Sequence, residues 1–336
     1  MTSIAGMNGV AAIPGMILMY SEHSATLLQK NVHLTTSDGL PLLVRQTSCA
    51  GATPLRTLVV VHGAGEHSQR YDHWARLLAQ HQWRVVSLDH RGCGLSGGLP
   101  GHVDRFDQYL SDLDQVWHEL ALDPERTIMF GHSLGGLISV RYAQTRPHAM
   151  RGLVLSGPLL ALQVKVPVWK RTLARLCSIL APRTRFQTTI RTDQLTRDPA
   201  ARKVRENDPL RCRSVTANWY FQVLDAMVAA WDDASRLTLP ILLLQGDSDE
   251  IVNPEAATRW WLALPARDKT LRLLSGHLHE LLSEPDWSHT AAGILAWLDV
   301  RFPEVNGLGC SAWLDRPQVA MAGQSRRLTM QAHAGG

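Results

Sequence analysis

The chain has 336 residues, of which 45% are hydrophobic and 19% charged, the proportions of an ordinary globular protein large enough to bury a full core. Its formal net charge of +4 at pH 7 is small and dispersed, which argues against a nucleic-acid partner. Its five cysteines show no C-x-x-C spacing, which argues against a disulfide framework and a zinc site and favours a reducing, cytoplasmic compartment: Cys49, Cys93, Cys177, Cys212 and Cys310.

Residues 1–30 are expected to form a loose N-terminal extension. Residues 1–19 are apolar and rich in small residues, and no Lys or Arg precedes Lys30, so the segment lacks the basic region of a signal peptide. Its Gly and Pro residues make it a poor membrane-spanning helix. We therefore expect an extension rather than a membrane anchor, so that any association with a membrane is peripheral.

Strand-like and helix-like runs then alternate, which predicts a mostly parallel sheet with helices on both faces. An antiparallel hairpin over 31–36 and 41–46, around Asp38-Gly39, is expected to come first. The later strands are expected at 57–62, 83–88, 127–130, 152–156, 240–245 and 270–274, and the helices at 69–80, 106–122, 137–144, 254–264 and 286–300.

The alternation stops at Gly157-Pro158. The stretch 158–238 is rich in Arg, has helical periodicity and lacks β-branched runs, so we predict a helical cap inserted into the core. The α/β core is then formed by 31–157 and 239–302. The remaining segment, 303–336, is rich in Gly, Gln, Ser and Ala and is expected to be a mostly disordered tail.

The sequence Gly131-His-Ser-Leu-Gly135 lies between the expected strand at 127–130 and a helical run. A G-x-S-x-G motif in this setting is typical of the nucleophile elbow of a serine hydrolase. The serine must stand on a strained turn, at which only small neighbours let two backbone segments approach closely. Ser133 is therefore the predicted nucleophile, and the N-terminus of the following helix favours negative charge beside it.

A serine hydroxyl is a weak nucleophile and needs a histidine base that is held by a carboxylate. The carboxylate belongs in the loop after a late strand, where Gly246-Asp-Ser-Asp-Glu250 offers several candidates. We favour Asp249, with Asp247 as the alternative because turn-forming Asp residues commonly follow a strand. The histidine belongs in the loop after the last core strand, where we favour His279 over His277.

An oxyanion hole needs two backbone N–H donors. One is expected from Leu134, the residue after the nucleophile, and the other from the loop His62-Gly-Ala-Gly65 after an early strand. Because the two glycines let this backbone turn inward, Ala64 is the expected second donor. His62 and His132 are expected to support their loops rather than to act as bases.

Four motifs occur in a characteristic order: His62-Gly-Ala-Gly-Glu-His-Ser-Gln-Arg-Tyr71, Asp89-His-Arg-Gly-Cys-Gly-Leu-Ser96, Gly131-His-Ser-Leu-Gly-Gly136 and Leu278-His-Glu-Leu-Leu-Ser-Glu-Pro285. Together they resemble the monoacylglycerol lipase and lysophospholipase family of α/β-hydrolases, and the resemblance covers residues 32–301. It implies an eight-stranded sheet and a helical cap above a pocket for a fatty acyl chain.

The resemblance also implies site residues that agree with those expected from the motifs. It assigns Ser133, Asp249 and His279 to a catalytic triad, with the oxyanion donors as above. One departure is Cys93, where the family usually has His. Since that loop is structural in our interpretation, the triad is unaffected.

The cap segment 168–180 predicts an amphipathic helix decorated by basic residues. Two interpretations stay open: the apolar face packs on the core, or the helix makes a transient contact with a membrane surface from which lipid is drawn. Pro158, Leu159 and Trp219 are candidates to line an apolar acyl tunnel, although consecutive aromatic residues such as 219–221 are also typical of a cap core.

The leading hypothesis is a serine carboxylic-ester hydrolase that releases a fatty acid from a monoacylglycerol or lysophospholipid through an acyl-enzyme on Ser133, with no metal or organic cofactor. The alternatives are a short-chain carboxylesterase and a peptidase or amidase. A peptidase would need acidic residues in the cap to hold a substrate amine, and this cap is rich in Arg. A non-catalytic binding protein is disfavoured because nucleophile, acid and base are all present. The sequence carries no signal for an oligomeric state.

Overall fold

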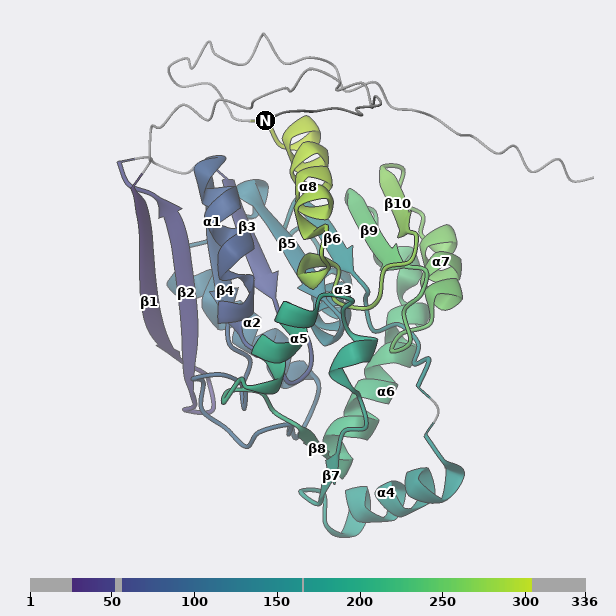
Figure 1. The fold of residues 1–336 in the computed structure, drawn as a ribbon. Coiled ribbons are helices and arrows are strands. Elements are labelled where there is room, and N and C mark those ends of the chain that lie inside the picture. The colour runs from purple at the N-terminus through teal and green to yellow at the C-terminus, as the bar shows by residue number, and fades with distance from the viewer. Residues whose placement is uncertain (1–25, 52–55, 165, 304–336) are drawn as a thin grey trace, which may run out of the picture. The chain divides into compact units, whose positions relative to one another are not determined.

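An eight-stranded sheet forms the centre of the computed structural model, which describes residues 26–51, 56–164 and 166–303 (Figure 1). The strand order is β1-β2-β4-β3-β5-β6-β9-β10, and only the β1–β2 and β2–β4 pairs are antiparallel. The predicted mostly parallel sheet is confirmed. Its strands are β1 (Leu27–Thr35), β2 (Pro41–Cys49), β3 (Arg56–Val61), β4 (Trp83–Leu88), β5 (Thr127–His132), β6 (Gly152–Ser156), β9 (Ile241–Gly246) and β10 (Lys269–Leu274).

Helices cover both faces of this sheet, as Figure 1 shows. The side chains of a strand alternate between faces, so Leu58 and Val60 of β3 join one apolar cluster and Val59 and Val61 join the other. The first cluster includes side chains of α1 and α8, and the second includes side chains of α2, α3 and α7. These helices are α1 (Asp72–Gln80), α2 (Asp107–Glu119), α3 (Leu134–Thr145), α7 (Pro254–Ala263) and α8 (Trp287–Arg301).

Between β6 and β9 the chain leaves the sheet and forms three helices and a small two-stranded sheet (Figure 1). The small sheet corrects the prediction of a purely helical insertion. Its strands have only three residues each and lie far apart in the sequence, so they carry no periodicity from which to predict them. The elements are α4 (Val168–Leu180), α5 (Pro199–Glu206), α6 (Ala217–Asp232), β7 (Arg185–Gln187) and β8 (Ser214–Thr216).

Helix α4 leaves its apolar side chains exposed. Ala174 is its only buried residue, whereas Trp169 is 65% exposed and Ile179 is 69% exposed. The interpretation in which this helix packs its apolar face on the core is therefore wrong. The hydrophobic periodicity predicted the helix correctly but did not determine what its apolar face contacts.

The N-terminal boundary of the core needs one correction. β1 begins at Leu27, so the predicted extension over 1–30 ends too late; most of β1 is exposed, and its polar residues carry a weak strand signal. Residues 1–25 and 304–336, where the rest of the extension and nearly all of the predicted tail fall, lie outside the described residues. Across the part of the chain that the structure describes, no helix is long and apolar enough to cross a membrane.

The carboxyl ends of the parallel strands all lie at one edge of the sheet, and the loops that follow them carry the predicted site. The loop after β3 holds Ala64, the β5–α3 turn holds Ser133, and the loops after β9 and β10 hold Asp249 and His279. This edge is where open α/β sheets bind ligands. Residues separated by more than 200 positions are thereby brought to one place.

Candidate active site

Ser133 occupies a strained turn between β5 and α3. Its φ of 53° and ψ of −118° lie outside the regions that L-residues prefer. Three hydrogen bonds hold the turn: Ser133 N–H donates to Ser156 O (3.1 Å), and the N–H groups of Leu137 and Leu159 donate to Ser133 O (3.1 and 3.0 Å). The predicted elbow is therefore present, and it is fixed by β6 and the chain that follows β6.

Glycine is required where the elbow touches its neighbours. A Cβ at Gly135 would collide with the carbonyl oxygen of Val61 at the end of β3, and a Cβ at Gly131 would collide with the side chain of Ser139 and the carbonyl oxygen of Gly135. Close packing of α3 on β3 and β5 thus depends on the absence of side chains at both positions.

Asp249 and His279 form a buried pair, 4% and 3% exposed. His279 Nδ1 lies 2.7 Å from Asp249 Oδ2. The carboxylate is held in turn by the N–H groups of Ile251 (2.8 Å) and Val252 (3.0 Å) and by the side-chain amide of Gln245 (2.9 Å). Because Nδ1 faces the carboxylate, Nε2 of His279 is the ring nitrogen left to exchange a proton.

For both side chains, the interaction between them shifts the pKa more than burial does. Burial alone lowers the pKa of His279, but the charge and hydrogen bond of Asp249 raise it to a net value above 6.5. Burial alone raises the pKa of Asp249, but His279 and the backbone N–H groups lower it below its usual value. The carboxylate is thus held ionised next to a histidine whose basicity it increases.

The alternative acid and base lie elsewhere. Asp247 is exposed, and its Oδ1 accepts hydrogen bonds from Gly276 N–H (2.7 Å) and from Ser248 Oγ–H (2.9 Å), which fits a turn residue. His277 Nε2 lies 3.1 Å from Asp286. Neither residue lines the cavity that contains Ser133 and His279.

The two residues expected to be oxyanion donors also belong to the lining of this cavity. Ala64 and Leu134 both line it, and within the described residues neither N–H donates a hydrogen bond. The Ser133 hydroxyl likewise forms no hydrogen bond within the described residues, a common condition before a substrate tightens such a site. The arrangement can therefore accept an oxygen that becomes negatively charged beside the serine.

The other histidines near the site support the loops. His62 Nδ1 contacts Gly63 O (2.8 Å), and the N–H of His90 donates to His62 Nε2 (3.0 Å). His132 Nδ1 lies 2.9 Å from Ser156 O, and its ring centre lies 4.8 Å from that of His279. Burial lowers the pKa of all three, which favours their neutral forms.

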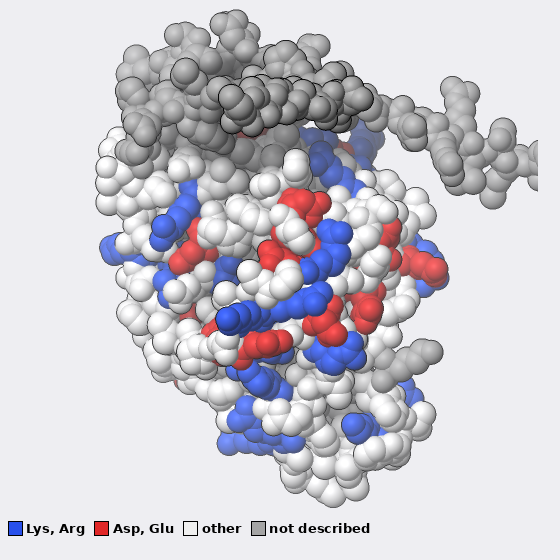
Figure 2. All heavy atoms as spheres, in the orientation of Figure 1, with Lys and Arg blue, Asp and Glu red and all other residues white. Residues whose placement is uncertain are grey.

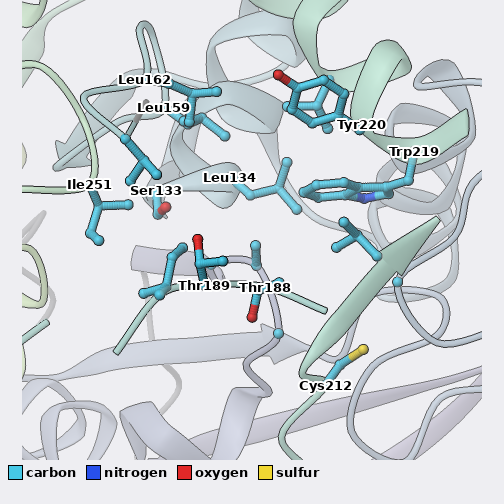
Figure 3. Close-up of a pocket in the computed structure, with 18 of the residues that line it drawn as sticks. Ser133, Leu134, Leu159, Leu162, Thr188, Thr189, Cys212, Trp219, Tyr220 and Ile251 are labelled. Atoms are coloured by element: carbon cyan, nitrogen blue, oxygen red, sulfur yellow. The ribbon is translucent and has the colours of Figure 1, made fainter. Parts of the chain in front are cut away.

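Ser133 opens into a cavity of about 280 Å³ between the core and the cap elements (Figure 3). Of the three predicted tunnel residues, Leu159 and Trp219 line this cavity. Pro158 does not: it packs behind the elbow against Gly136. Tyr220, Leu162 and Ile251 extend the apolar wall around the serine (Figure 3).

A cluster of charged residues that we did not anticipate lies beside the site. Glu66, in the loop after β3, accepts hydrogen bonds through Oε2 from Gly63 N–H (3.1 Å) and Tyr71 Oη–H (3.0 Å). Arg205 of α5 lies 2.9 Å from Glu66 and 2.6 Å from Glu280, the residue after His279. Glu66 and Glu280 fall inside the motifs, but no local pattern singles out Arg205.

Within the described residues, no group of three or more His, Cys, Asp or Glu could hold a metal ion.

Comparison with known proteins is consistent with this geometry. The sequence profile of the family described as serine aminopeptidase S33 matches residues 52–286, most of the chain. The chain belongs to this family of α/β-hydrolases. Within it, the protein is 34% identical to the monoglyceride lipase of Rattus norvegicus over 256 residues, which cover 75% of this chain and 84% of the rat protein.

Two further proteins are also similar. Phospholipase YtpA of Bacillus subtilis is 28% identical over 240 residues, which cover 69% of this chain and 91% of that protein. The crystal structure of the Paleococcus ferrophilus monoacylglycerol lipase superposes with a TM-score of 0.69 at 32% identity, covering 82% of this chain and 99% of that one. The resemblance and the α/β-hydrolase fold expected from the motifs are thus confirmed.

Replacing Gly135 by Ala tests the close approach at the elbow. We expect Gly135→Ala to lower the free energy of unfolding by about 3 kcal/mol, since its Cβ meets backbone that cannot rotate away. Gly293→Ala in α8 is the matched control: its Cβ meets only the mobile guanidinium of Arg272, and Ala favours the helix. Urea unfolding measures both, and equal stability of the two variants would contradict the prediction.

Proposed function

We propose that the protein is a serine carboxylic-ester hydrolase that releases a fatty acid from a single-chain glycerolipid, either a monoacylglycerol or a lysophospholipid. The ester-hydrolase class follows from its relatives, which include enzymes named monoglyceride lipase and monoacylglycerol lipase. The observation that supports a lipid substrate is the cavity, whose lining includes Ser133 and an extended set of apolar residues.

The proposed chemistry uses each group of the site in turn. Ser133 Oγ attacks the ester carbonyl while His279 Nε2 takes the hydroxyl proton, and Asp249 stabilises the imidazolium that forms. The N–H groups of Ala64 and Leu134 donate to the oxyanion. His279 then gives the proton to the leaving alcohol, and water activated by the same imidazole cleaves the acyl-enzyme.

The apolar part of the cavity suits an acyl chain. The residues of its wall come from the segment after β6 and from α6. Several of these residues also line an adjoining hollow of about 530 Å³. A chain that follows this wall replaces water contacts with apolar contacts along its length. The shared apolar residues are Leu162, Val164, Val166, Tyr220 and Leu224.

A peptidase activity fits the cavity less well. The carboxylates that line it within the described residues are Glu66 and Glu280, and both are engaged by Arg205. Neither is free to bind the ammonium group of a peptide. The family description names an aminopeptidase, but within the described residues this cavity offers no free carboxylate to hold a substrate amine.

We also propose that α4 rests transiently on a membrane surface. Pro167, Lys170 and Ala174 line the cavity, so the helix borders it while its apolar side chains face outward. Over α4, the face in Figure 2 carries basic and uncharged atoms but no acidic ones. An exposed apolar stripe with basic flanks is typical of helices that bind anionic lipid surfaces. The stripe consists of Val168, Trp169, Leu173, Leu176, Ile179 and Leu180.

The nucleophile and the substrate class can be tested together. Wild-type protein is expected to hydrolyse a long-chain monoacylglycerol, and Ser133→Ala to lower kcat by about 10⁴-fold or more because no acyl-enzyme forms. A short-chain p-nitrophenyl ester is assayed in parallel. Turnover of the short ester alone would contradict the lipid substrate and favour a short-chain esterase while retaining Ser133.

The pH dependence tests the roles of His279 and Asp249. Because protonated His279 cannot accept the serine proton, kcat/KM falls as the pH drops through its pKa, which lies above 6.5. Asp249→Asn removes the charge that raises this pKa, so the acid limb moves to lower pH and kcat falls by about 10⁴-fold. Asp247→Asn is the control, and an equal effect of the two substitutions would contradict the assignment.

Vesicle binding tests the membrane contact. Trp169→Glu is expected to weaken binding to phosphatidylglycerol vesicles by about tenfold or more, since it removes a large apolar side chain and adds repulsion. Leu262→Glu is the matched control because Leu262 is similarly exposed (62%) but lies on α7. Sedimentation with vesicles measures both, and equal binding by both variants would exclude α4 as the contact.

A further inference from the structure

One end of the catalytic cavity is charged, in contrast to its apolar wall. Four residues form this polar end: Glu66, Arg205, Arg211 and Glu280. It adjoins the oxyanion loop, because Cys212 N–H donates to Gly65 O (3.3 Å) and the Cys212 carbonyl occupies the space that a Gly65 Cβ would need. If a substrate places its ester at Ser133 and its acyl chain along the apolar wall, the polar end is available to bind its alcohol part.

Three of the four residues at the polar end neutralise one another, with help from Arg70. Arg205 Nη1 lies 2.9 Å from Glu66 Oε1 and 2.6 Å from Glu280 Oε1, and Arg70 Nη2 lies 2.7 Å from Glu280 Oε2. Two cations thus match two anions. All four side chains are largely withdrawn from solvent.

Arg205 nevertheless has a buried donor without a hydrogen-bond partner in the part of the chain that the structure describes. The residue is 6% exposed, and its Nε is buried with no hydrogen-bond partner among the described residues. A buried donor without an acceptor is costly, so such groups are usually satisfied by a ligand or water. Since Arg205 lines the cavity, an acceptor bound there lies near this donor.

Arg211 is a further cation at the polar end, and within the described residues it has no ion-pair partner. It is half-buried in the cavity wall, and within the described residues its side chain forms no hydrogen bond or ion pair. The nearest carboxylate in sequence, Asp208, is engaged by His67 (2.8 Å) and by the N–H of Leu210 (2.9 Å). Burial, together with the charges of Arg205 and Arg213, lowers the pKa of Arg211. An anion in the cavity would relieve this repulsion.

We propose that Arg211, together with Nε of Arg205, binds the phosphate of a lysophospholipid whose fatty ester is cleaved at Ser133. The proposal rests on the proposed function and selects between its two substrate classes. A phosphate offers several charged acceptors to a planar guanidinium, whereas the hydroxyls of a monoacylglycerol leave Arg211 without a counter-charge. The ester C–O bond breaks, and water supplies OH to the fatty acid and H to the glycerophosphoryl product.

The first experiment compares two lipids that share one acyl chain. Hydrolysis of 1-oleoyl-lysophosphatidylglycerol and of 1-oleoylglycerol is measured below their critical micelle concentrations. In Arg211→Leu, the ratio of kcat/KM for the phospholipid to that for the neutral lipid is expected to fall about tenfold or more, through KM. Arg211→Lys keeps the charge and is expected to lose less. Arg213→Leu, on an exposed neighbour that donates to Glu206 O, is the matched control.

The second experiment does not depend on a lipid substrate. Glycerol 3-phosphate is tested as an inhibitor of p-nitrophenyl butyrate hydrolysis. Competitive inhibition that is about tenfold weaker in Arg211→Leu than in Arg213→Leu supports the anion site. If wild-type protein cleaves the short ester but neither lipid, the proposed function fails, and the inhibition by glycerol 3-phosphate still decides whether the anion site exists.

Two results would overturn the proposal. The first is an unchanged lipid ratio in Arg211→Leu together with unchanged inhibition by glycerol 3-phosphate. The second is Arg211-dependent inhibition by inorganic phosphate without any change in the lipid ratio, which would mean that Arg211 binds free anions and not the lipid headgroup.

Discussion

The close contact between the start of α3 and the end of β3 is the constraint on which the site depends. Because Gly135 has no side chain, the helix packs against the carbonyl of Val61, and Ser133 is held at a positive φ above the sheet. That conformation is strained, and hydrogen bonds from three directions stabilise it. The same contact brings Leu134 to the cavity that Ala64 also lines, so the proposed nucleophile and the proposed oxyanion donors depend on one packing arrangement.

A buried carboxylate connects this arrangement to the cap. Glu66 uses one oxygen to hold Gly63 in the oxyanion loop and the other to bind Arg205 of α5. Arg205 also contacts Glu280, the neighbour of His279. The cap, the oxyanion loop and the histidine loop therefore share one charged cluster. Removing one member would leave an uncompensated buried charge, so the position of α5 and the geometry of the two loops are energetically coupled.

The cavity that contains Ser133 combines two chemical environments. Apolar side chains of the cap line one part, and the charged cluster with Arg211 lines the other. A single-chain lipid has the same division, with its ester at the junction between acyl chain and headgroup. Helix α4 borders the cavity and exposes an apolar face to the outside, which is the basis of the proposed contact with a lipid surface.

The sequence by itself determined most elements of the core and the residues proposed to react. The elbow, Ser133 and the oxyanion loop follow from short motifs, because a tight turn restricts residue types locally. The centre of the sheet follows from short apolar runs, since β3, β5, β6 and β9 are buried along their whole length.

Only the tertiary structure decided the rest. Asp249 rather than Asp247 faces His279, the β7–β8 pair forms in the cap, Pro158 packs behind the elbow, and α4 exposes its apolar face. It also brings Arg205 and Arg211 to the oxyanion loop, although they lie about 140 residues beyond it in the chain. These outcomes depend on which distant segments meet, and a local pattern of residue types carries no information about the partner that long-range packing supplies.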